Sequence, residues 1–470
     1  MSITLKKNRT RTERRLDEAL HDLRAAFGER ISTGQSVREI HGRDESWHPP
    51  ALPDAVVFPR TTEEISFICQ TCTKYGVPII AFGAGSSIEG ALIPVEGGIV
   101  VSTVEMKQLL DVDSISFNCT VQPGLCRREL NEQLRDTGLF FTVDPGADAS
   151  IGGMVATRAS GTNTVRYGTM ADAVLGLEVV LADGRVIKTG SRARKSAAGY
   201  DLTHLFTGSE GTLGIVTKIT LKLAPLPETI ASATCAFSDL ENAVEAAVAV
   251  IGSGMGVARI ELLDELMIAA VNDYSKTDLP VSPHLFLEFH GTTESTRAEA
   301  ELAASIAADY GGEAFQWTTK AEDRNRLWRA RHDCAYACMA SQPSKRMLTT
   351  DVCVPRSALT ECILQSRRDA EEKGLSAPVL GHVGDGNFHM ALLIDPEDRG
   401  ELAAAKSVAS ALVERALAAG GTATGEHGIG LGKRDYMRRE HGDNAVDMMA
   451  GIKALFDPDN LLNPGKVLPD

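Results

Sequence analysis

Two of the chain's 11 histidines, His382 and His389, flank the tripeptide GDG at 384–386. In a fully extended chain, residues seven apart stand roughly 23 Å from each other, so the two imidazoles can share a ligand only if the chain reverses between them. Glycine accepts positive φ and Asp bonds its own backbone in turns. Apolar runs lie on both sides, at 378–380 and 390–394. This pattern predicts a strand, a tight turn and a second strand.

Two histidines on such a turn can supply nitrogen ligands to a divalent metal. With a carboxylate from elsewhere in the chain they would form a site with two nitrogen ligands and one oxygen ligand, leaving positions open for substrate. A second cluster with the sequence GEHG follows at 425–428. The alternative is that the histidines are ordinary turn and strand residues, and spacing alone does not separate the two interpretations.

The size and composition of the chain predict a soluble protein with two or more domains. It has 470 residues, of which 43% are hydrophobic and 24% are charged. The formal net charge of −15 argues against nucleic-acid binding, because phosphate recognition requires an excess of Lys and Arg. No apolar run reaches the roughly 18 residues that a membrane-spanning helix needs.

The N-terminal region is basic from residue 6 to residue 15 and lacks the apolar core of a secretory signal. After it, Leu16, Leu20, Leu23 and Phe27 have the spacing of one helical face, which predicts an amphipathic helix packed on the body of the protein. A transit peptide or a weak contact with a membrane surface is the alternative.

The cysteines predict free thiols in a reducing compartment, because there are nine of them in a long chain. Cys69 and Cys72 have CxxC spacing, but they lie within a segment of helical pattern and no second pair exists. They are therefore expected to be buried helix thiols, not a redox or iron–sulfur site.

The first half of the chain has a strand–helix–strand pattern that runs directly into the small residues of the loop at 83–87. Small residues allow backbone N–H groups to close around an anion. The sixth position of the loop is Ile88, where a nicotinamide-binding Rossmann fingerprint needs Gly or Ala, and no clear helix follows. The loop is predicted to bind a diphosphate. A glycine-rich surface turn would explain this loop if it stood alone.

It does not stand alone, because further segments rich in small residues follow at 144–154, 159–168 and 207–216. Such density implies backbone lying close to something flat or phosphorylated. The sequence pattern changes after the proline-rich stretch at 223–227. Glycine clusters give way to alternating strand and helix patterns. These patterns predict an α+β cap whose antiparallel sheet carries helices on one face.

Arginine is densest within the cap, at 324–332. Most such clusters are solvated helix faces. A single arginine of the cluster could instead bind a carboxylate, because its planar guanidinium fits that group with two parallel hydrogen bonds.

The order of these segments resembles the FAD-binding domain of the vanillyl-alcohol oxidase superfamily. The loop at 83–87, PGAxxSIGG at 145–153 and GSEGTLGIVT at 208–217 carry the resemblance. It implies an α+β fold with a two-part FAD-binding domain of the VAO/PCMH type at 51–226. An N-terminal helical extension would occupy 1–50, a substrate cap with an antiparallel sheet 227–420, and a C-terminal return to the FAD domain 421–470. The implied FAD contacts are Gly83, Ala84, Gly85, Ser86, Ser87, Pro145, Gly146, Ala147, Ser150, Ile151, Gly152, Ser160, Gly161, Gly208, Glu210, Gly211, Ile215 and Asn463.

The whole chain resembles the FAD-linked D-2-hydroxyacid dehydrogenases, a group that includes D-lactate and D-2-hydroxyglutarate dehydrogenases and the glycolate oxidase catalytic subunit. Their pattern HxGDGNxH is matched at 382–389 and their EHG motif at 426–428. Position by position, the resemblance implies that a zinc or manganese ion binds His382, His389 and Glu426, and that His427 is the catalytic base. It also implies that the substrate contacts Asn387 and Arg331, the arginine three residues after Trp328.

One position departs from part of this family. Members that take a dicarboxylic acid have a lysine two residues before an aspartate, where this chain has Thr349 before Asp351. The missing cation argues against 2-hydroxyglutarate, because a desolvated second carboxylate would lack its partner.

The resemblance therefore implies oxidation of a D-2-hydroxy acid, above all D-lactate, to the 2-oxo acid. A hydride would pass to flavin N5, a divalent metal would polarise the hydroxyl and His427 would take its proton. A D-2-hydroxyglutarate or glycolate dehydrogenase, an enzyme like the flavin-dependent ether-lipid synthases, and a flavin protein without turnover are the alternatives.

No NAD site is visible, so a quinone, a cytochrome or an electron-transfer flavoprotein is expected to accept the electrons. The expected location is the cytoplasm, with a peripheral place at the inner membrane as an option, or the mitochondrion in a eukaryote. A homodimer is left open.

Overall fold

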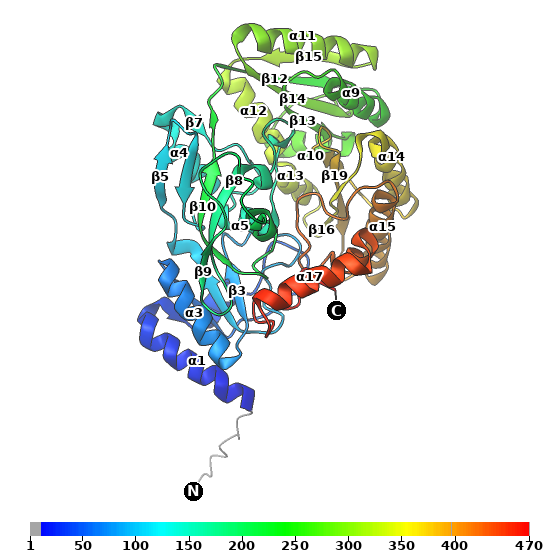
Figure 1. The fold of residues 1–470 in the computed structure, drawn as a ribbon. Helices are drawn as coiled ribbons and strands as arrows, with labels where there is room; N and C mark the ends of the chain where they lie inside the picture. The colour runs from blue at the N-terminus through cyan, green and yellow to red at the C-terminus, as the bar shows by residue number, and fades with distance from the viewer. Residues whose placement is uncertain (1–10, 396, 470) are drawn as a thin grey trace.

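The computed structural model describes residues 11–395 and 397–469 of the chain. The N-terminal half contains two larger sheets and a two-stranded one, and the C-terminal half contains a single large sheet. Helix α17 (Asp443–Phe456) runs back from the C-terminal half to the N-terminal half (Figure 1).

The first sheet has the order β1-β2-β4-β3, in which β2, β4 and β3 are parallel. Its strands are β1 (Ile31–Ser32), β2 (Ala55–Val57), β3 (Ile79–Phe82) and β4 (Ile99–Ser102). Helix α3 (Thr62–Tyr75) connects β2 to β3. Thr61 caps this helix by accepting a hydrogen bond from the Glu64 N–H. The predicted strand–helix–strand is therefore present, and β3 leads directly into the loop at 83–87.

Cys69 and Cys72 are fully buried on helix α3, as predicted. Burial raises the pKa of the Cys69 thiol to about 12, which keeps it protonated and unreactive at neutral pH. All nine cysteines are free thiols.

The second sheet is antiparallel, with the order β5-β6-β10-β8-β9. Its strands are β5 (Leu109–Asp113), β6 (Asn118–Val121), β8 (Val174–Val180), β9 (Val186–Lys188) and β10 (Ile215–Lys222). Side chains of β10 alternate between buried and half-buried, because successive residues of a strand point to opposite faces. Helix α5 (Ile151–Thr157) packs against this sheet, and the Ser150 hydroxyl caps it by accepting from the Gly153 N–H.

The N-terminal half contains further helices and strands. They are α1 (Arg11–Phe27), α2 (Gln35–Ile40), α4 (Arg127–Gln133), α6 (Thr164–Tyr167), α7 (Met170–Ala173), α8 (Leu202–Phe206), β7 (Leu139–Phe140) and β11 (Ala224–Pro225). Leu20, Leu23 and Phe27 of α1 are buried in the core that includes α3, so the predicted amphipathic helix is confirmed. The basic segment at 6–15, considered above as a transit peptide, lies mostly outside the described residues.

The cap is built on an eight-stranded sheet with the order β15-β12-β14-β13-β18-β19-β16, in which β17 also pairs with β19. Every pairing in this sheet is antiparallel. Its strands are β12 (Thr229–Ala236), β13 (Val257–Leu263), β14 (His284–Gly291), β15 (Glu313–Thr318), β16 (Arg346–Thr349), β17 (Val352–Cys353), β18 (Val379–Gly381) and β19 (Asn387–Ile394).

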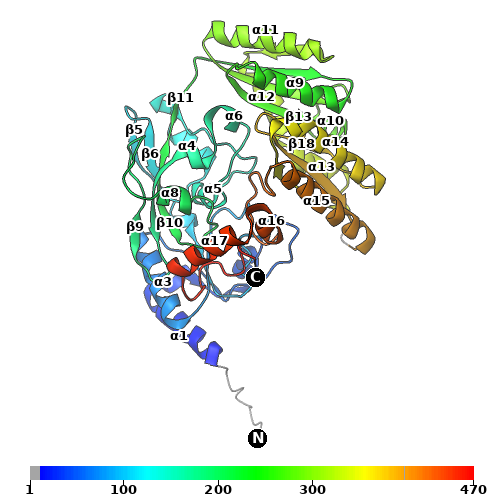
Figure 2. The same ribbon diagram turned by 45° about the vertical axis from the view of Figure 1, so that its right-hand side comes forward.

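Helices cover both faces of the cap sheet, so the prediction that they lie on one face was wrong. One face carries α9 (Leu240–Gly252), α11 (Thr293–Asp309), α14 (Arg356–Glu372) and α15 (Arg399–Ala418). The other carries α10 (Glu265–Ser275), α12 (Ala321–His332) and α13 (Cys334–Ser341). The reason is that strand β14 is apolar in both directions: Leu285 and Leu287 belong to the first core and Phe286 to the second. Figure 2 shows α9 and α11 on the outer side of the cap.

The C-terminal segment returns to the first sheet through α16 (Met437–His441) and α17. The Ile79 N–H of β3 donates to the Leu461 carbonyl at 2.7 Å, and the Asn463 N–H donates to the Ile79 carbonyl at 2.8 Å. The end of the described chain therefore stabilises the strand that leads into the loop at 83–87. Within residues 11–395 and 397–469, no helix has the length and apolar character required to cross a membrane.

Candidate active site

The two histidines of the opening motif lie on the predicted strand–turn–strand. Strands β18 and β19 are antiparallel neighbours, and Leu380 pairs with His389 across them. At the turn, Gly386 has a φ of +84°, and a Cβ there would stand 2.1 Å from the Val354 carbonyl oxygen, so only glycine fits. His389 shares a strand face with Ala391, and this face belongs to the core that also contains α10, α12 and α13.

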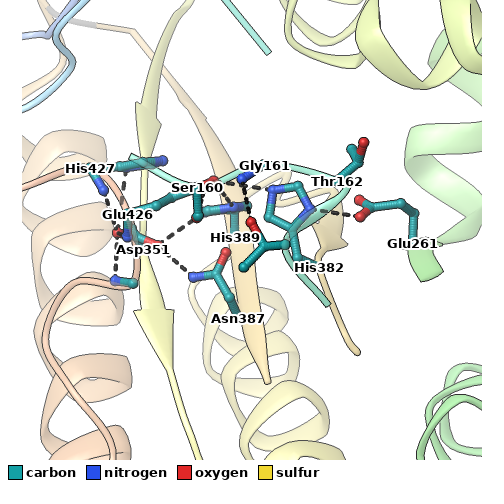
Figure 3. Close-up of polar contacts among 12 residues, drawn as sticks. Ser160, Gly161, Thr162, Glu261, Asp351, His382, Asn387, His389, Glu426 and His427 are labelled. Carbon is teal, nitrogen blue, oxygen red and sulfur yellow. Dashed lines mark hydrogen bonds and ion pairs between the residues drawn. The ribbon is translucent and has the colours of Figure 1, made fainter. Parts of the chain in front are cut away.

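Glu426 lies beside the two histidines, although it belongs to a different segment of the sequence. Its Oε1 lies 3.2 Å from His382 Nε2 and 3.3 Å from His389 Nε2 (Figure 3). Ligand atoms at about 2.0 Å from a tetrahedral zinc ion stand roughly 3.3 Å from one another. The three side chains therefore fit a divalent ion, and they are the residues that would hold it.

Both imidazoles present Nε2 to Glu426, and hydrogen bonds at Nδ1 explain why. His389 Nδ1 lies 3.1 Å from the Thr350 carbonyl oxygen, which only accepts, so this nitrogen carries the proton. His382 Nδ1 lies 2.7 Å from Glu261 Oε1. Such partners orient metal-binding histidines and select the tautomer whose other nitrogen is free.

The charges at this position favour a cation. Burial lowers the pKa of His382, but Glu261 and Glu426 outweigh burial and raise the pKa well above its ordinary value. Burial likewise raises the pKa of Glu426, but His382 and His389 bring it well below its ordinary value. A proton or a metal ion can satisfy this demand for positive charge, and the two compete for the same nitrogen.

Asp351 holds the segment that carries Glu426 and His427. It is fully buried, and its Oδ2 accepts from the backbone N–H groups of Gly425, Glu426 and His427 at 2.7, 2.9 and 3.0 Å. The hydroxyl of Thr424 donates to the same oxygen at 2.8 Å. Burial raises the pKa of Asp351, but His427 and His389 outweigh it, so the carboxylate stays ionised far below neutral pH.

The imidazole of His427 stacks on that of His389, with ring centroids 4.9 Å apart and planes 3° from parallel. Its Nδ1 lies 3.8 Å from Glu89 Oε1 and has no hydrogen-bond partner among the described residues. Burial lowers the pKa of His427, but Asp351, Glu89 and Glu426 raise it above its ordinary value. A higher pKa makes the imidazole a stronger proton acceptor.

Arg331 is the only arginine of the 324–332 cluster whose side chain is buried. Its Nε and Nη2 donate to Glu261 Oε2 at 2.9 and 2.6 Å. This contact uses one edge of the guanidinium and leaves Nη1 for a second anion. The side chain lines the same cavity as His382 and His427.

Asn387, predicted to contact substrate, lies near this group but does not line the cavity. Its amide nitrogen donates to Asp351 Oδ1 at 2.7 Å and to the Val352 carbonyl at 2.8 Å. Its Oδ1 has no partner among the described residues. The position of Asn387 therefore supports Asp351, and a substrate contact stays a prediction.

One cavity of about 720 Å³ connects the glycine-rich loops to the histidines. This volume is within the range of cofactor sites and exceeds what a small hydroxy acid needs. The predicted FAD contacts that line it are Gly83, Ala84, Gly85, Ser86, Ser87, Pro145, Gly146, Ala147, Ser150, Gly152, Ser160, Glu210, Gly211 and Ile215.

Four predicted FAD contacts do not line the cavity: Ile151, Gly161, Gly208 and Asn463. Gly161 is needed for packing, because a Cβ there would stand 2.4 Å from the Asp144 backbone. The Asn463 amide nitrogen donates to the carbonyls of Ala91 and Glu210 at 2.9 and 2.8 Å. Asn463 therefore supports the wall of the cavity from behind, and its place near the flavin ring stays a prediction.

The side chain of Glu210 has a structural task that its motif did not reveal. Its two oxygens accept from the N–H groups of Ile429 and Gly430 at 2.6 and 2.9 Å. These residues follow the EHG motif directly. Glu210 therefore ties the glycine-rich domain to the segment that carries His427.

Glu261 was missed by sequence reasoning, and so was the structural role of Asp351. Each is a lone acidic residue beside apolar neighbours, in the segments 257–263 and 347–354. A carboxylate in such a place must be paired, which is a signal that was available. Trp47, which also lines the cavity, gave no comparable signal.

The position that argued against a dicarboxylic substrate, Thr349, lines the cavity. Lys345 and Arg346 line it as well, and Lys345 is paired with Glu401. The cavity therefore contains positive charge despite the threonine, so Thr349 alone does not exclude a second substrate carboxylate.

The glycine-rich loops, the large cavity and the capping sheet define an FAD-linked oxidoreductase. Residues 53–190 match the family described as FAD binding domain, and residues 226–467 match FAD linked oxidases, C-terminal domain. The chain belongs to the FAD-linked oxidase family, and the presence of an FAD-binding domain is confirmed, whereas the bounds predicted for the domains stay predictions.

Relatives similar over nearly the whole chain come from animals, plants and bacteria. The chain is 50% identical to the probable D-lactate dehydrogenase, mitochondrial, of Danio rerio, over 96% of this chain and 92% of the relative. It is 42% identical to the D-lactate dehydrogenase (cytochrome), mitochondrial, of Arabidopsis thaliana, over 96% and 80%. It is 34% identical to the glycolate oxidase subunit GlcD of Bacillus subtilis, over 93% and 94%.

Solved structures confirm the predicted fold of the vanillyl-alcohol oxidase superfamily. A p-cresol methylhydroxylase with bound substrate superposes with a TM-score of 0.78 at 17% identity, over 97% of both chains. An alkyldihydroxyacetonephosphate synthase superposes with a TM-score of 0.74 at 19% identity, over 99% of this chain and 88% of that chain. At these identities the likeness establishes the fold alone.

Proposed function

We propose that this protein oxidises a D-2-hydroxy acid, D-lactate first among them, to the corresponding 2-oxo acid with FAD. The observation that carries the proposal is the single cavity lined by the glycine-rich loops, by Arg331 and by the His382–His389–Glu426 group. The names of the Danio rerio and Arabidopsis thaliana relatives support D-lactate as the substrate.

In the proposed reaction, the substrate loses its hydroxyl proton and its Cα hydrogen with two electrons. Arg331 binds the carboxylate through its free edge and thereby orients the hydroxyl and Cα. His427 takes the hydroxyl proton, and Asp351 fixes the backbone on which His427 sits. When bound, FAD supplies the hydride acceptor, and a divalent ion at the histidines lowers the pKa of the hydroxyl.

The electrons must then leave the flavin. The name of the Arabidopsis thaliana relative supports a cytochrome as the acceptor, and a quinone or an electron-transfer flavoprotein are the other candidates. The names of the same relative and the Danio rerio protein support a mitochondrial location if the source is eukaryotic.

The test measures reduction of the bound flavin in the absence of air. The reduction is monitored as bleaching of the flavin absorbance. D-lactate is compared with L-lactate, glycolate and D-2-hydroxyglutarate, and D-lactate is expected to react fastest. His427→Ala should retain FAD and lose at least about 100-fold in the rate of reduction. The control is His284→Ala, because His284 is a buried histidine of the cap that does not line the cavity. Normal reduction by the His427 variant would remove this residue from the mechanism.

The metal is tested separately. Dialysis against a chelator should abolish reduction by D-lactate, and zinc or manganese should restore it. His382→Ala should no longer respond to added metal. Full activity of a protein shown by elemental analysis to be free of metal would refute the role of the metal and leave the role of FAD standing.

A further inference from the structure

Glu261 lies in the middle of strand β13 and is fully buried. Its carboxylate is divided between two groups of the site. Oε1 lies 2.7 Å from His382 Nδ1, on the side of the imidazole away from Glu426 (Figure 3). Oε2 accepts from Nε and Nη2 of Arg331. One side chain therefore touches both a residue that would hold the metal and the residue that would hold the substrate carboxylate.

We propose that Glu261 is a positioning residue that orients the metal ligand His382 and the carboxylate clamp Arg331 together. This inference rests on the proposed function. It means that His382 and Arg331 are both held in place by a residue that itself touches neither metal nor substrate.

Glu261 fixes the side chain of Arg331 before any substrate binds. A long arginine side chain has many rotamers, and fixing it in one of them costs conformational entropy. Two hydrogen bonds to Glu261 Oε2 hold the guanidinium in one orientation. The free Nη1 edge then points in one direction, and substrate binding does not have to supply that ordering.

Glu261 also selects the tautomer of His382. A carboxylate at Nδ1 keeps the proton on that nitrogen, so that Nε2 has a free lone pair toward Glu426 and a metal ion. The donors and acceptors among Glu261, His382 and Arg331 cannot exchange roles. Glu261 accepts from all three N–H groups and offers no donor, and Arg331 has no acceptor.

Glutamine at this position cannot satisfy both partners. If its oxygen accepts from Arg331, its NH₂ group faces His382 Nδ1, and only the imidazole tautomer with the proton on Nε2 fits. If its oxygen accepts from His382, its NH₂ group faces the Arg331 donors. Glu261→Gln conserves the shape of the side chain but must weaken the metal ligand or the clamp.

The experiment measures zinc binding and pyruvate binding to the oxidised, FAD-loaded protein. Zinc affinity is measured by titration of the metal-free protein, and pyruvate affinity by the change in the flavin spectrum. Glu261→Gln should retain FAD and weaken at least one of the two affinities by about 10- to 100-fold. Glu261→Ala removes both contacts and should weaken both.

The matched control is Glu178→Gln. Glu178 is a buried strand glutamate that accepts from Thr62 and Lys218 in the N-terminal half of the chain, away from the histidines. It should change neither affinity, whatever it does to the melting temperature. Wild-type affinities for both zinc and pyruvate in FAD-loaded Glu261→Gln would overturn the inference. If Glu261→Ala does not fold, Glu261→Gln decides alone.

Failure of the proposed function gives a different result. In that case the wild-type protein itself would bind neither zinc nor pyruvate, before any variant is compared. A wild-type protein that binds both, with an unaffected Glu261→Gln variant, refutes only the role of Glu261.

Discussion

Substitution of Asp351 by Asn should disable the site while leaving the protein folded. Asp351 Oδ2 accepts from the N–H groups of Gly425, Glu426 and His427 and from the hydroxyl of Thr424. Its Oδ1 accepts from the amide of Asn387 at 2.7 Å. An Asn side chain has one accepting oxygen, so it can serve only one of these two sides.

The free-energy cost of Asp351→Asn follows from the loss of one accepting oxygen. If the Asn oxygen stays with the three backbone N–H groups, its NH₂ group faces the NH₂ group of Asn387 and the Nδ1–H of His389, which lies 3.5 Å from Asp351 Oδ1. One hydrogen bond to a charged acceptor, worth about 1.5–3 kcal/mol, is then replaced by facing donors. Loss of one partner from a buried charged network typically costs about 3–5 kcal/mol. A stability of about 5–15 kcal/mol can absorb that loss, so the variant is expected to fold and bind FAD.

The substitution should displace mainly the segment at 424–427, because Asp351 holds this segment, and with it Glu426 and His427, in place. A displacement of about 1 Å at a reacting group costs about 100-fold in rate. We therefore expect Asp351→Asn to reduce the rate of flavin reduction by D-lactate at least about 100-fold and to weaken zinc binding. The assays are flavin bleaching without air and zinc titration, with urea unfolding as the measure of stability.

Asp264→Asn is the control, because Asp264 is also a fully buried cap aspartate that accepts from two backbone N–H groups, those of Met267 and Val379. It should retain flavin reduction. An Asp351→Asn variant that reduces its flavin within about threefold of the wild-type rate would show that Asp351 does not position the segment.

Two further predictions concern other regions of the fold. Gly83→Ala should prevent FAD loading, because its Cβ would stand 2.2 Å from Ser150 Oγ. Gly252→Ala, which lies outside the cavity and has nothing within 4 Å of its Cβ, should load FAD normally; the flavin content of the purified proteins decides this. Burial raises the pKa of Asp264 from 3.8 to about 7, so its contribution to stability is fully present below pH 3.8 and is lost as the pH rises through 7. Asp264→Asn should therefore remove up to about 4 kcal/mol of the decline in unfolding free energy between about pH 4 and pH 8, measured by urea titration, and an unchanged decline would contradict the assignment.

The sequence by itself determined the local features of this protein. The turn between His382 and His389 follows from glycine and aspartate chemistry, helix α3 from its cap at Thr61, and the buried thiols from helical spacing. These features depend on dihedral preferences and on periodicity within one element, which neighbouring residues carry. The order of the glycine-rich segments likewise identified the FAD domain, since each of those loops is formed by consecutive residues of the chain.

Only the tertiary structure decided how groups distant in the chain share their hydrogen bonds. Glu261 and His382 are 121 positions apart, and Asp351 and His427 are 76 apart, yet each pair is in direct contact. The same limit explains the cap helices on both faces and the place of Asn463 behind the cavity wall. A pattern within one segment shows that a buried carboxylate needs a partner, but the partner is set by how strands and helices pack, and packing is not encoded in any single segment.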